Sequence, residues 1–361
     1  MLTIYMDKYR NIQMKVKNKI QRYILDNVIT HPRDITRLTA SEFGITRQAV
    51  NRYLQQLVET NLLISKGTTR NKEYVLKPLT EVKFELTISE GLEEDRVWRE
   101  RIDPLLEGLP RNIYDICNYG FTEMLNNVIY HSEGQKVNIS ITITVATIDI
   151  IVDDDGIGIF NKIQRELHLE HPRDAILELS KGKFTTDPER HTGEGIFFTS
   201  KMFDKFIIYS GNLAFIHQEY RDGILLEEYD REKRGTIIEI TIRTNTTRTP
   251  EHIFKKFTVD GDDFGFSKTI VPVELVRYGN ENLISRSQAK RLLVRFERFK
   301  EIVLDFKGVD KIGQAFADEI FRVFCNQHPD INIHFINTNN YVKNMISRAR
   351  SVNNVSSESS Q

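Results

Sequence analysis

Three polar side chains recur at four-residue intervals in the middle of this chain, as Glu123, Asn127 and His131. On a helix, each four-residue step turns by about 40°, so all three would project from nearly one face over about 12 Å. The amide oxygen of Asn127 could coordinate Mg²⁺, which prefers oxygen ligands. The carboxylate of Glu123 could hold an attacking hydroxyl or water and accept its proton. Taken alone, the pattern also fits a helix that turns polar residues to solvent.

Two glycine motifs follow this segment, Asp154-x-Gly156-x-Gly158 and Gly193-x-Gly195. A carboxylate at a strand end can accept a hydrogen bond from an exocyclic amine, and glycines let a base or phosphate approach the backbone. Glycines that open a helix leave backbone N–H groups at its positive end, where a triphosphate could bind. An ordinary Asp-rich turn is the alternative for the first motif.

Polar residues before Gly193 could close over such phosphates. They are Lys181, Lys183, Thr185 and Thr186, in a stretch that we expect to be flexible. Lysines in loops are most often simply solvated, which is the alternative.

The surrounding pattern predicts the elements that would position these residues. A helix is expected over 112–130, strands over 137–145 and 148–152, and a helix over 196–203. Residues 160–192 look irregular apart from a short helix at 174–179. Further strands are expected at 206–210, 213–219, 225–229 and 236–242. This order predicts an α+β layer, with helices on one face of a mixed or antiparallel sheet.

The first 80 residues are basic, although the whole chain carries a net charge of only -1. They contain 14 Lys and Arg against 6 Asp and Glu. The pattern predicts a helix ending before Pro32, a second over 35–43 and a third from Thr46 to about Asn61. A hairpin of 62–66 and 73–77 follows. Three helices and a hairpin are the parts of a winged helix-turn-helix.

The outward face of the third helix is rich in donors for bases and phosphates, as a recognition helix requires. The candidate DNA-binding residues there and at the hairpin are Arg47, Gln48, Asn51, Arg52, Lys66 and Arg70. We therefore predict that residues 1–80 bind double-stranded DNA. The alternative is a solvated helix that docks a protein or the neighbouring domain.

The remaining segments complete the predicted organisation. Residues 81–110 look like a connector in which Trp98 packs. Residues 244–249 look like a linker to a small α/β domain over about 250–350, and Ser351–Gln361 looks like a disordered tail.

Together, the central motifs resemble the GHKL ATPases, which include sensor histidine kinases, the gyrase B subunit, the heat-shock 90 chaperone and the anti-sigma serine kinases. The resemblance covers residues 111–245 and implies an α/β sandwich that binds ATP and Mg²⁺. It implies that Glu123 is the general base and that Asn127 binds the metal. It also implies that Asp154 and Thr236 lie at the adenine, while His131 and the remaining motif residues belong to the nucleotide site. Those remaining residues are Gly156, Gly158, Lys183, Thr186, Gly193 and Gly195.

The C-terminal domain resembles the STAS-like fold of the anti-anti-sigma proteins, over about residues 265–350. In those proteins a phosphorylatable serine precedes a helix. Here the corresponding positions are Gly313, Gln314 and Ala315, none of which can accept a phosphoryl group. This domain is therefore expected to dock a protein partner or to imitate one.

Two functions remain open. In the first, nucleotide binding or hydrolysis controls DNA or partner binding, as in a transcription regulator. In the second, the protein is a kinase of the anti-sigma type that phosphorylates Ser, Thr or His on a separate partner. Some GHKL-like ATPases of defence or repair systems are a further alternative. A homodimer is compatible with the helix-turn-helix.

The composition predicts a cytoplasmic protein. The N-terminal segment lacks the apolar stretch of a secretory signal. No run approaches the roughly 18 apolar residues of a membrane span. The two cysteines, Cys117 and Cys325, lie far apart and fit a reducing compartment.

Overall fold

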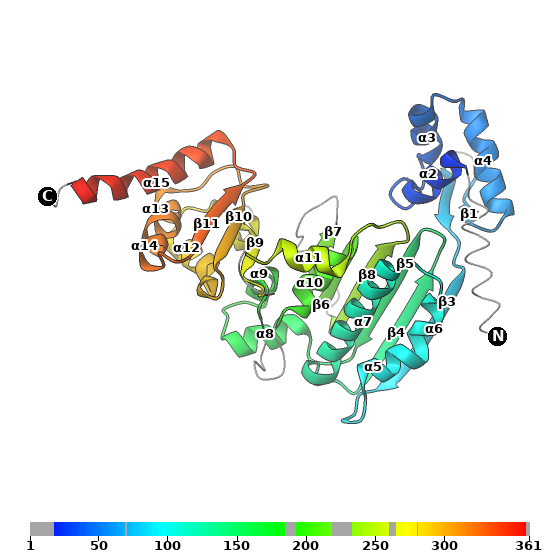
Figure 1. Ribbon diagram of the computed structural model, residues 1–361, viewed down its shortest axis with the longest axis horizontal. Coiled ribbons are helices and arrows are strands. Elements are labelled where there is room, and N and C mark those ends of the chain that lie inside the picture. The colour runs from blue at the N-terminus through cyan, green and yellow to red at the C-terminus, as the bar shows by residue number, and fades with distance from the viewer. Residues whose placement is uncertain are drawn as a thin grey trace. The chain divides into compact units, whose positions relative to one another are not determined.

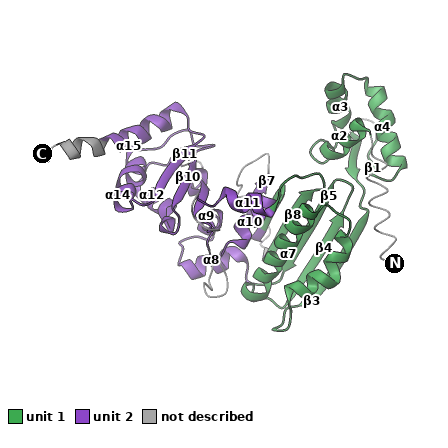
Figure 2. Cartoon of the chain, in the orientation of Figure 1, with its two compact units in different colours: residues 1–156, 203–208, 235–249 green, residues 157–202, 209–234, 250–361 purple. Residues whose placement is uncertain are grey.

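The computed structural model describes residues 18–68, 71–184, 193–218, 233–259, 265–279 and 281–358. The chain forms two compact units (Figures 1 and 2). The first unit comprises 1–156, 203–208 and 235–249, and the second comprises 157–202, 209–234 and 250–361. The predicted ATP-binding segment, 111–245, therefore contributes to both units instead of forming one. The chain is a mixed α and β protein, as expected.

Three helices and a hairpin open the first unit, at the predicted places. The helices are α2 (Lys19–Asn27), α3 (Ile35–Phe43) and α4 (Arg47–Glu59). Strands β1 (Leu63–Lys66) and β2 (Glu73–Leu76) pair antiparallel. Gly44 ends α3 in a left-handed conformation, and the Thr46 hydroxyl caps α4 by accepting from the Ala49 amide at 3.2 Å. Val50, Leu54 and Leu57 are buried, as the helical spacing predicted.

A six-stranded sheet follows, in the order β3-β4-β5-β8-β6-β7. Its strands are β3 (Thr80–Thr87), β4 (Lys136–Ile143), β5 (Thr147–Asp154), β6 (Lys205–Gly211), β7 (Leu213–Gln218) and β8 (Lys233–Arg243). The pairs β3–β4, β4–β5 and β5–β8 are antiparallel. The strand expected at 225–229 lies outside the described residues.

The segment 81–110 is part of the folded layer, so its prediction as a connector was wrong. Strand β3 begins at Thr80 and pairs along its whole length with β4. Helix α5 (Glu94–Val97), the π-helical turn η2 (Trp98–Ile102) and α6 (Asp103–Leu106) come next. Trp98 is 2% exposed and its indole N–H donates to the Tyr114 hydroxyl at 3.2 Å. Its predicted packing role is confirmed.

Helix α7 (Arg111–His131) matches the predicted long helix and lies over the sheet face formed by β4, β5 and β8 (Figure 1). The residues that it buries include Ile116, Phe121, Leu125 and Val128. Because these buried residues share one face of α7, the less apolar positions of the helix lie on the opposite face. Cys117 is also buried in this helix, where desolvation raises the pKa of its thiol.

The second unit contains more helix than the sequence indicated. Helix α8 (Ile159–Leu167) occupies a stretch that we expected to be irregular, because its polar residues obscured the apolar positions Phe160 and Ile163. Helix α9 (Asp174–Lys181) is two residues longer than predicted and is buried throughout. Helices α10 (Gly195–Met202) and α11 (Pro250–Lys256) follow.

A parallel three-stranded sheet, in the order β11-β10-β9, carries the C-terminal part. In chain order, the strands and helices of this part are β9 (Lys268–Pro272), η3 (Val273–Val276), α12 (Arg286–Leu293), η4 (Phe296–Arg298), β10 (Glu301–Asp305), α13 (Gln314–Asp318), η5 (Glu319–Phe324), α14 (Cys325–Gln327), β11 (Asn332–Ile336) and α15 (Asn340–Glu358). The predicted small α/β domain is confirmed in outline. The predicted disordered tail was wrong for 351–358, because α15 continues to Glu358. Among the described helices, none is long and apolar enough to cross a membrane.

Candidate functional site

Helix α7 places Glu123, Asn127 and His131 on one continuous helix, so their four-residue spacing is realised in space. All three side chains are half-buried. The Nδ2 atom of Asn127 is buried and has no hydrogen-bond partner among the described residues. A buried polar atom that lacks a partner is costly, and such atoms in native proteins often mark ligand sites. Asn127 is therefore a candidate for contact with a bound group.

Asp154 ends β5 and is the best-defined residue of the candidate site. Its carboxylate is 4% exposed. Its Oδ1 atom accepts from the Gly156 amide at 2.8 Å and from the Thr236 amide at 3.3 Å. The two donors come from the turn after β5 and from β8, so they fix the orientation of the carboxylate. Thr236, which is 6% exposed, is thereby brought next to Asp154.

Two glycines close this site so tightly that no side chain fits. A Cβ on Gly156 would lie 2.1 Å from the Ser132 carbonyl oxygen, and one on Gly235 would lie 2.0 Å from the Asp154 carbonyl oxygen. Gly235 also has a φ of +79°, which only glycine adopts readily. Because Ser132 directly follows α7, the first contact joins the end of α7 to the Asp154 turn.

A second pair of contacts fixes the same corner, and the sequence analysis missed it. The Asp155 Oδ1 atom accepts from the amides of Gln135 and Lys136, at 2.7 and 2.9 Å. A Cβ on Gly134 would lie 2.7 Å from that same oxygen. A glycine shortly after a helix end, opposite an Asp-rich turn, was the available signal. The first unit thus brings together the end of α7, the Asp154 turn and the start of β8.

Within the described part of the chain, no group of three or more His, Cys, Asp or Glu side chains could hold a metal ion. Asn127 is an oxygen donor of another type and falls outside that pattern.

The other motif glycines belong to the second unit. Gly158 has a φ of +86° and precedes α8, where its carbonyl accepts from the Lys162 amide at 3.0 Å. Gly193 has a φ of +71°, and its carbonyl accepts from the Phe184 amide at 3.1 Å. A Cβ on Gly193 would lie 2.3 Å from the Phe184 carbonyl carbon. Gly195 is the first residue of α10. Gly193 therefore needs to be glycine because of its packing against Phe184.

The lysines before Gly193 lie elsewhere than expected. Lys181 is 0% exposed and pairs with Glu178 at 2.6 Å, so it cannot belong to a flexible lid. Lys183 donates to the Arg298 carbonyl at 2.9 Å, and its ammonium lies 5.1 Å from the centre of the Phe299 ring. Thr185 and Thr186 lie outside the described residues. Lys181 is buried together with the rest of α9, including its apolar neighbours Leu177 and Leu179.

The predicted DNA-contacting face of α4 is exposed. Arg47, Gln48, Asn51 and Arg52 are all exposed, while the core positions of the same helix are buried. Lys66, at the end of β1, is exposed too, and Arg70 lies outside the described residues. The helix therefore presents its polar, basic face outward.

Gly313 precedes α13 at the position where the resemblance leads one to look for a phosphorylatable serine. Its amide donates to the Leu283 carbonyl at 2.7 Å. A Cβ at this position would lie 2.7 Å from the Ile284 Cα atom. Close packing against the Leu283–Ile284 backbone thus explains the glycine.

Comparison with known proteins finds a family match for one part of the chain. No curated protein matches this chain. Residues 288–343 match a family described as "STAS-like domain of unknown function (DUF4325)". This match runs from α12 to the start of α15 and includes the central strand β10 of the parallel sheet. The C-terminal part of this protein is therefore a STAS-like domain.

Proposed function

We propose that this protein is an ATP-binding regulator, in which nucleotide binding or hydrolysis controls the binding of DNA or of a protein partner. The observation that carries the proposal is the surroundings of Asp154 at the end of β5. A buried carboxylate is oriented there by two backbone amides and enclosed by glycines that leave no room for a side chain. Sites that read small ligands combine tight enclosure with a few fixed polar groups.

In this proposal, Asp154 recognises the adenine ring of ATP. A carboxylate is an acceptor only, so it would pair with the donating exocyclic amine of adenine and reject a carbonyl at that position. Thr236, whose amide donates to Asp154, adds a hydroxyl at the same corner. Gly156 and Gly235 support the role because they keep the turn close to the end of α7 and to β8.

Residues of α7 would hold the metal and the attacking group. When bound, Mg²⁺ would neutralise phosphate charge, and the amide oxygen of Asn127 is a suitable ligand for it. The Nδ2 atom of Asn127, which is buried and has no hydrogen-bond partner within the described residues, fits donation to a bound group. Glu123, two turns of helix away from His131, would accept the proton of the attacking water or hydroxyl. The roles of His131, Gly158, Gly193 and Gly195 rest on the GHKL resemblance.

The N-terminal three-helix part is proposed to be a winged helix-turn-helix that binds double-stranded DNA. Its support is the exposed basic face of α4 and the exposed Lys66 on the hairpin. We propose that transcription is regulated through this contact, and that the STAS-like domain docks a protein partner.

The proposal is tested by nucleotide binding to full-length Asp154→Asn. The amide that replaces the carboxylate loses an acceptor oxygen opposite the adenine amine. We expect ATP affinity to fall about 10- to 100-fold, the loss typical of an unpaired buried polar contact. The matched control is Asp153→Asn, the same change at the adjacent strand position, whose side chain lies on the opposite face of the sheet. Equal affinity of Asp154→Asn and wild type would contradict the proposal.

A second experiment separates a switch from a kinase. γ-labelled ATP is incubated with the protein and candidate partners, and the label is followed. Free phosphate without labelled protein supports the regulator, whereas labelled protein supports the kinase of the anti-sigma type. Glu123→Gln should abolish either turnover and leave ATP binding within about threefold, because a general base is not needed for binding.

A further inference from the structure

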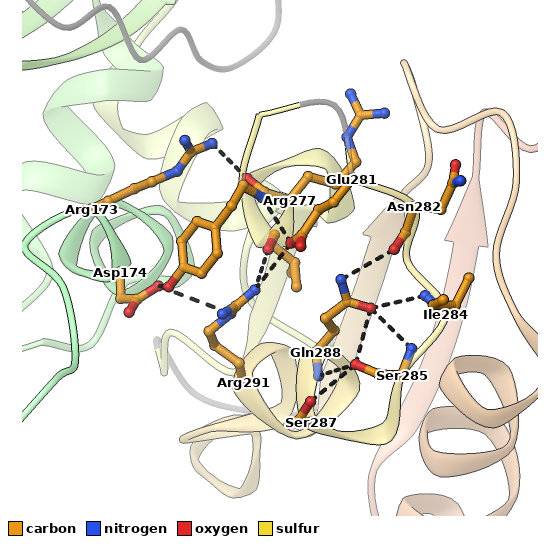
Figure 3. A network of polar contacts seen from close by, with 12 residues as sticks. Arg173, Asp174, Arg277, Glu281, Asn282, Ile284, Ser285, Ser287, Gln288 and Arg291 are labelled. Atoms are coloured by element: carbon orange, nitrogen blue, oxygen red, sulfur yellow. Dashed lines mark hydrogen bonds and ion pairs between the residues drawn. The ribbon is translucent and has the colours of Figure 1, made fainter.

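Helix α9 is held inside the second unit at its first turn by contacts with η3 and the loop after it (Figure 3). The Arg173 guanidinium donates to the Arg277 carbonyl at 2.6 Å. The Tyr278 hydroxyl donates to Asp174 Oδ1 at 2.7 Å. The guanidinium of Arg291, from α12, lies 4.1 Å from the centre of the Tyr278 ring. The start of α9 is thus bound to the segment that precedes α12.

The last turn of α9 is held by buried charges. Glu178 accepts from the Lys181 ammonium at 2.6 Å and from the Arg295 guanidinium at 3.0 Å. The side chains of Glu178, Lys181 and Arg295 are 3, 0 and 8% exposed, respectively. Lys181 also donates to the Val294 carbonyl at 2.9 Å. The Lys181 carbonyl in turn accepts from the Thr269 hydroxyl of β9 at 2.8 Å.

Burying these three charged side chains is costly. Burial of ions costs several kcal/mol per ion before pairing offsets it. Two cations here share one carboxylate, so backbone carbonyls must accept the remaining N–H groups. Arg295 also has a φ of +64°, in the left-handed region that non-glycine residues seldom occupy. Such outliers persist where the surrounding contacts hold the residue in place.

Arg295 reaches directly to the chain that leads into the glycine motif. Its guanidinium donates to the Gly182 carbonyl at 3.0 Å and to the Lys183 carbonyl. The next residue, Phe184, donates its amide to the Gly193 carbonyl. Arg295 therefore fixes two consecutive carbonyls immediately before the residue on which Gly193 packs.

We propose that Arg295 of the STAS-like domain is a positioning residue for the Gly193 turn. Through Gly182, Lys183 and Phe184 it sets the place of Gly193, and so couples the STAS-like domain to the phosphate-binding part of the nucleotide site. The inference rests on the proposed ATP binding, in which Gly193 faces the phosphates. The amides that orient Asp154, which is proposed to bind the adenine, are not among the groups that Arg295 holds.

The test compares ATP with adenosine on full-length Arg295→Lys. The guanidinium binds Glu178 through Nη1 and the two carbonyls through Nη2. Lysine keeps a cation beside Glu178 but has a single nitrogen, which does not reproduce this planar, two-ended geometry. We expect the Kd of ATP to rise about 10-fold, since one or two hydrogen bonds are lost. The Kd of adenosine should stay within about twofold. The control is Arg286→Lys, at the start of α12, where the side chain is 63% exposed and lies 3.6 Å from the Asp318 carboxylate.

A second measurement makes no use of ligand. Hydrogen exchange of the Phe184 amide should be at least about 10-fold faster in Arg295→Lys than in wild type, while Arg286→Lys leaves it unchanged. Equal weakening of ATP and adenosine, or an unchanged Phe184 amide, would overturn the inference. If the wild type binds neither ATP nor adenosine, the proposed function fails. The exchange rate then decides alone whether Arg295 positions Phe184.

Discussion

Asp154 and Glu178 are both buried carboxylates, but their partners differ in kind. Taken as whole residues, Asp154 is 4% exposed and Glu178 is 2% exposed. One oxygen of Asp154 accepts from two backbone amides, those of Gly156 and Thr236. Each oxygen of Glu178 is bound by a cationic side chain, Oε1 by Lys181 and Oε2 by Arg295.

Under the proposed function, the difference separates a carboxylate that binds a ligand from one that stabilises the fold. Backbone amides orient a carboxylate without moving when a ligand arrives, which suits recognition. Cationic side chains neutralise it and link distant segments of the chain, which suits structure. Burial alone therefore does not identify a functional carboxylate. The enclosing glycines at Asp154 and the buried cations at Glu178 make the distinction.

The largest expected effect comes from Glu178→Ala. Removing the carboxylate leaves Lys181 and Arg295 buried without a counter-ion, so we expect the free energy of unfolding to fall by about 3–5 kcal/mol. Denaturant unfolding measures it. The control, Glu100→Ala, breaks a surface pair with Arg96 and should cost less than about 0.5 kcal/mol. Similar losses in the two variants would erase the distinction drawn above.

A smaller effect is expected for Gly235→Ala, which tests the enclosure of Asp154. The new Cβ would meet the Asp154 carbonyl oxygen at 2.0 Å and the backbone would be held at a positive φ. We expect a loss of about 3 kcal/mol in unfolding free energy, with weaker ATP binding. Gly211 also has a positive φ, of +60°, but a Cβ added there would meet nothing within 4 Å. The control Gly211→Ala should therefore cost only about 1 kcal/mol in unfolding free energy. An equal cost at both positions would mean that Gly235 is needed for its conformation alone.

The buried lysine predicts a dependence of stability on pH. Desolvation lowers the pKa of Lys181 in the folded protein, although Glu178 opposes the shift. Between the folded pKa and the ordinary pKa of 10.5, the unfolded chain binds more protons than the folded protein does. The free energy of unfolding therefore rises with pH across that window, up to about pH 10.5. The contribution is lost as pH falls through the folded pKa. The free energies of unfolding of wild type and Lys181→Met, measured across this pH range, isolate the contribution of Lys181. Parallel dependences of the two on pH would refute this prediction.

The smallest effect on stability is expected for Asp154→Asn. The Asn carbonyl oxygen can still accept from the Gly156 and Thr236 amides, so the unfolding free energy should change by no more than about 1 kcal/mol. Thermal unfolding of the same sample used for ATP binding checks it. A loss as large as that of Glu178→Ala would make Asp154 a structural residue as well.

Much of the fold could be predicted because local signals coincide with the elements. Helix α3 begins at Ile35 and ends before Gly44, as its apolar spacing and its glycine stop indicated. Strand β3 was missed because its residues are all half-buried or exposed, as on a sheet edge, and only pairing with β4 identifies it. The last helix was predicted to end before α15 does, because Ser and Asn in the last turns of α15 are typical of a disordered tail.

The candidate site was predictable where it depends on spacing within one element. The alignment of Glu123, Asn127 and His131 follows from helix geometry once α7 forms. The burial of Lys181 was not predictable, because two groups around it lie far away in the chain. The Val294 carbonyl, to which Lys181 donates, is 113 residues away, and Arg295, which shares Glu178 with Lys181, is 114 residues away. Local sequence cannot show which charged residues the fold will bury together.

The sequence by itself determined the spacing of the polar residues on α7, the glycine motifs and the basic face of α4. These depend on helix periodicity and on backbone conformations that belong to single residues. Only the tertiary structure decided that the Thr236 amide would bind Asp154, and that Glu178 would be neutralised by Lys181 and Arg295. The reason is physical: a buried charge is stable only beside partners that chain folding supplies from distant positions.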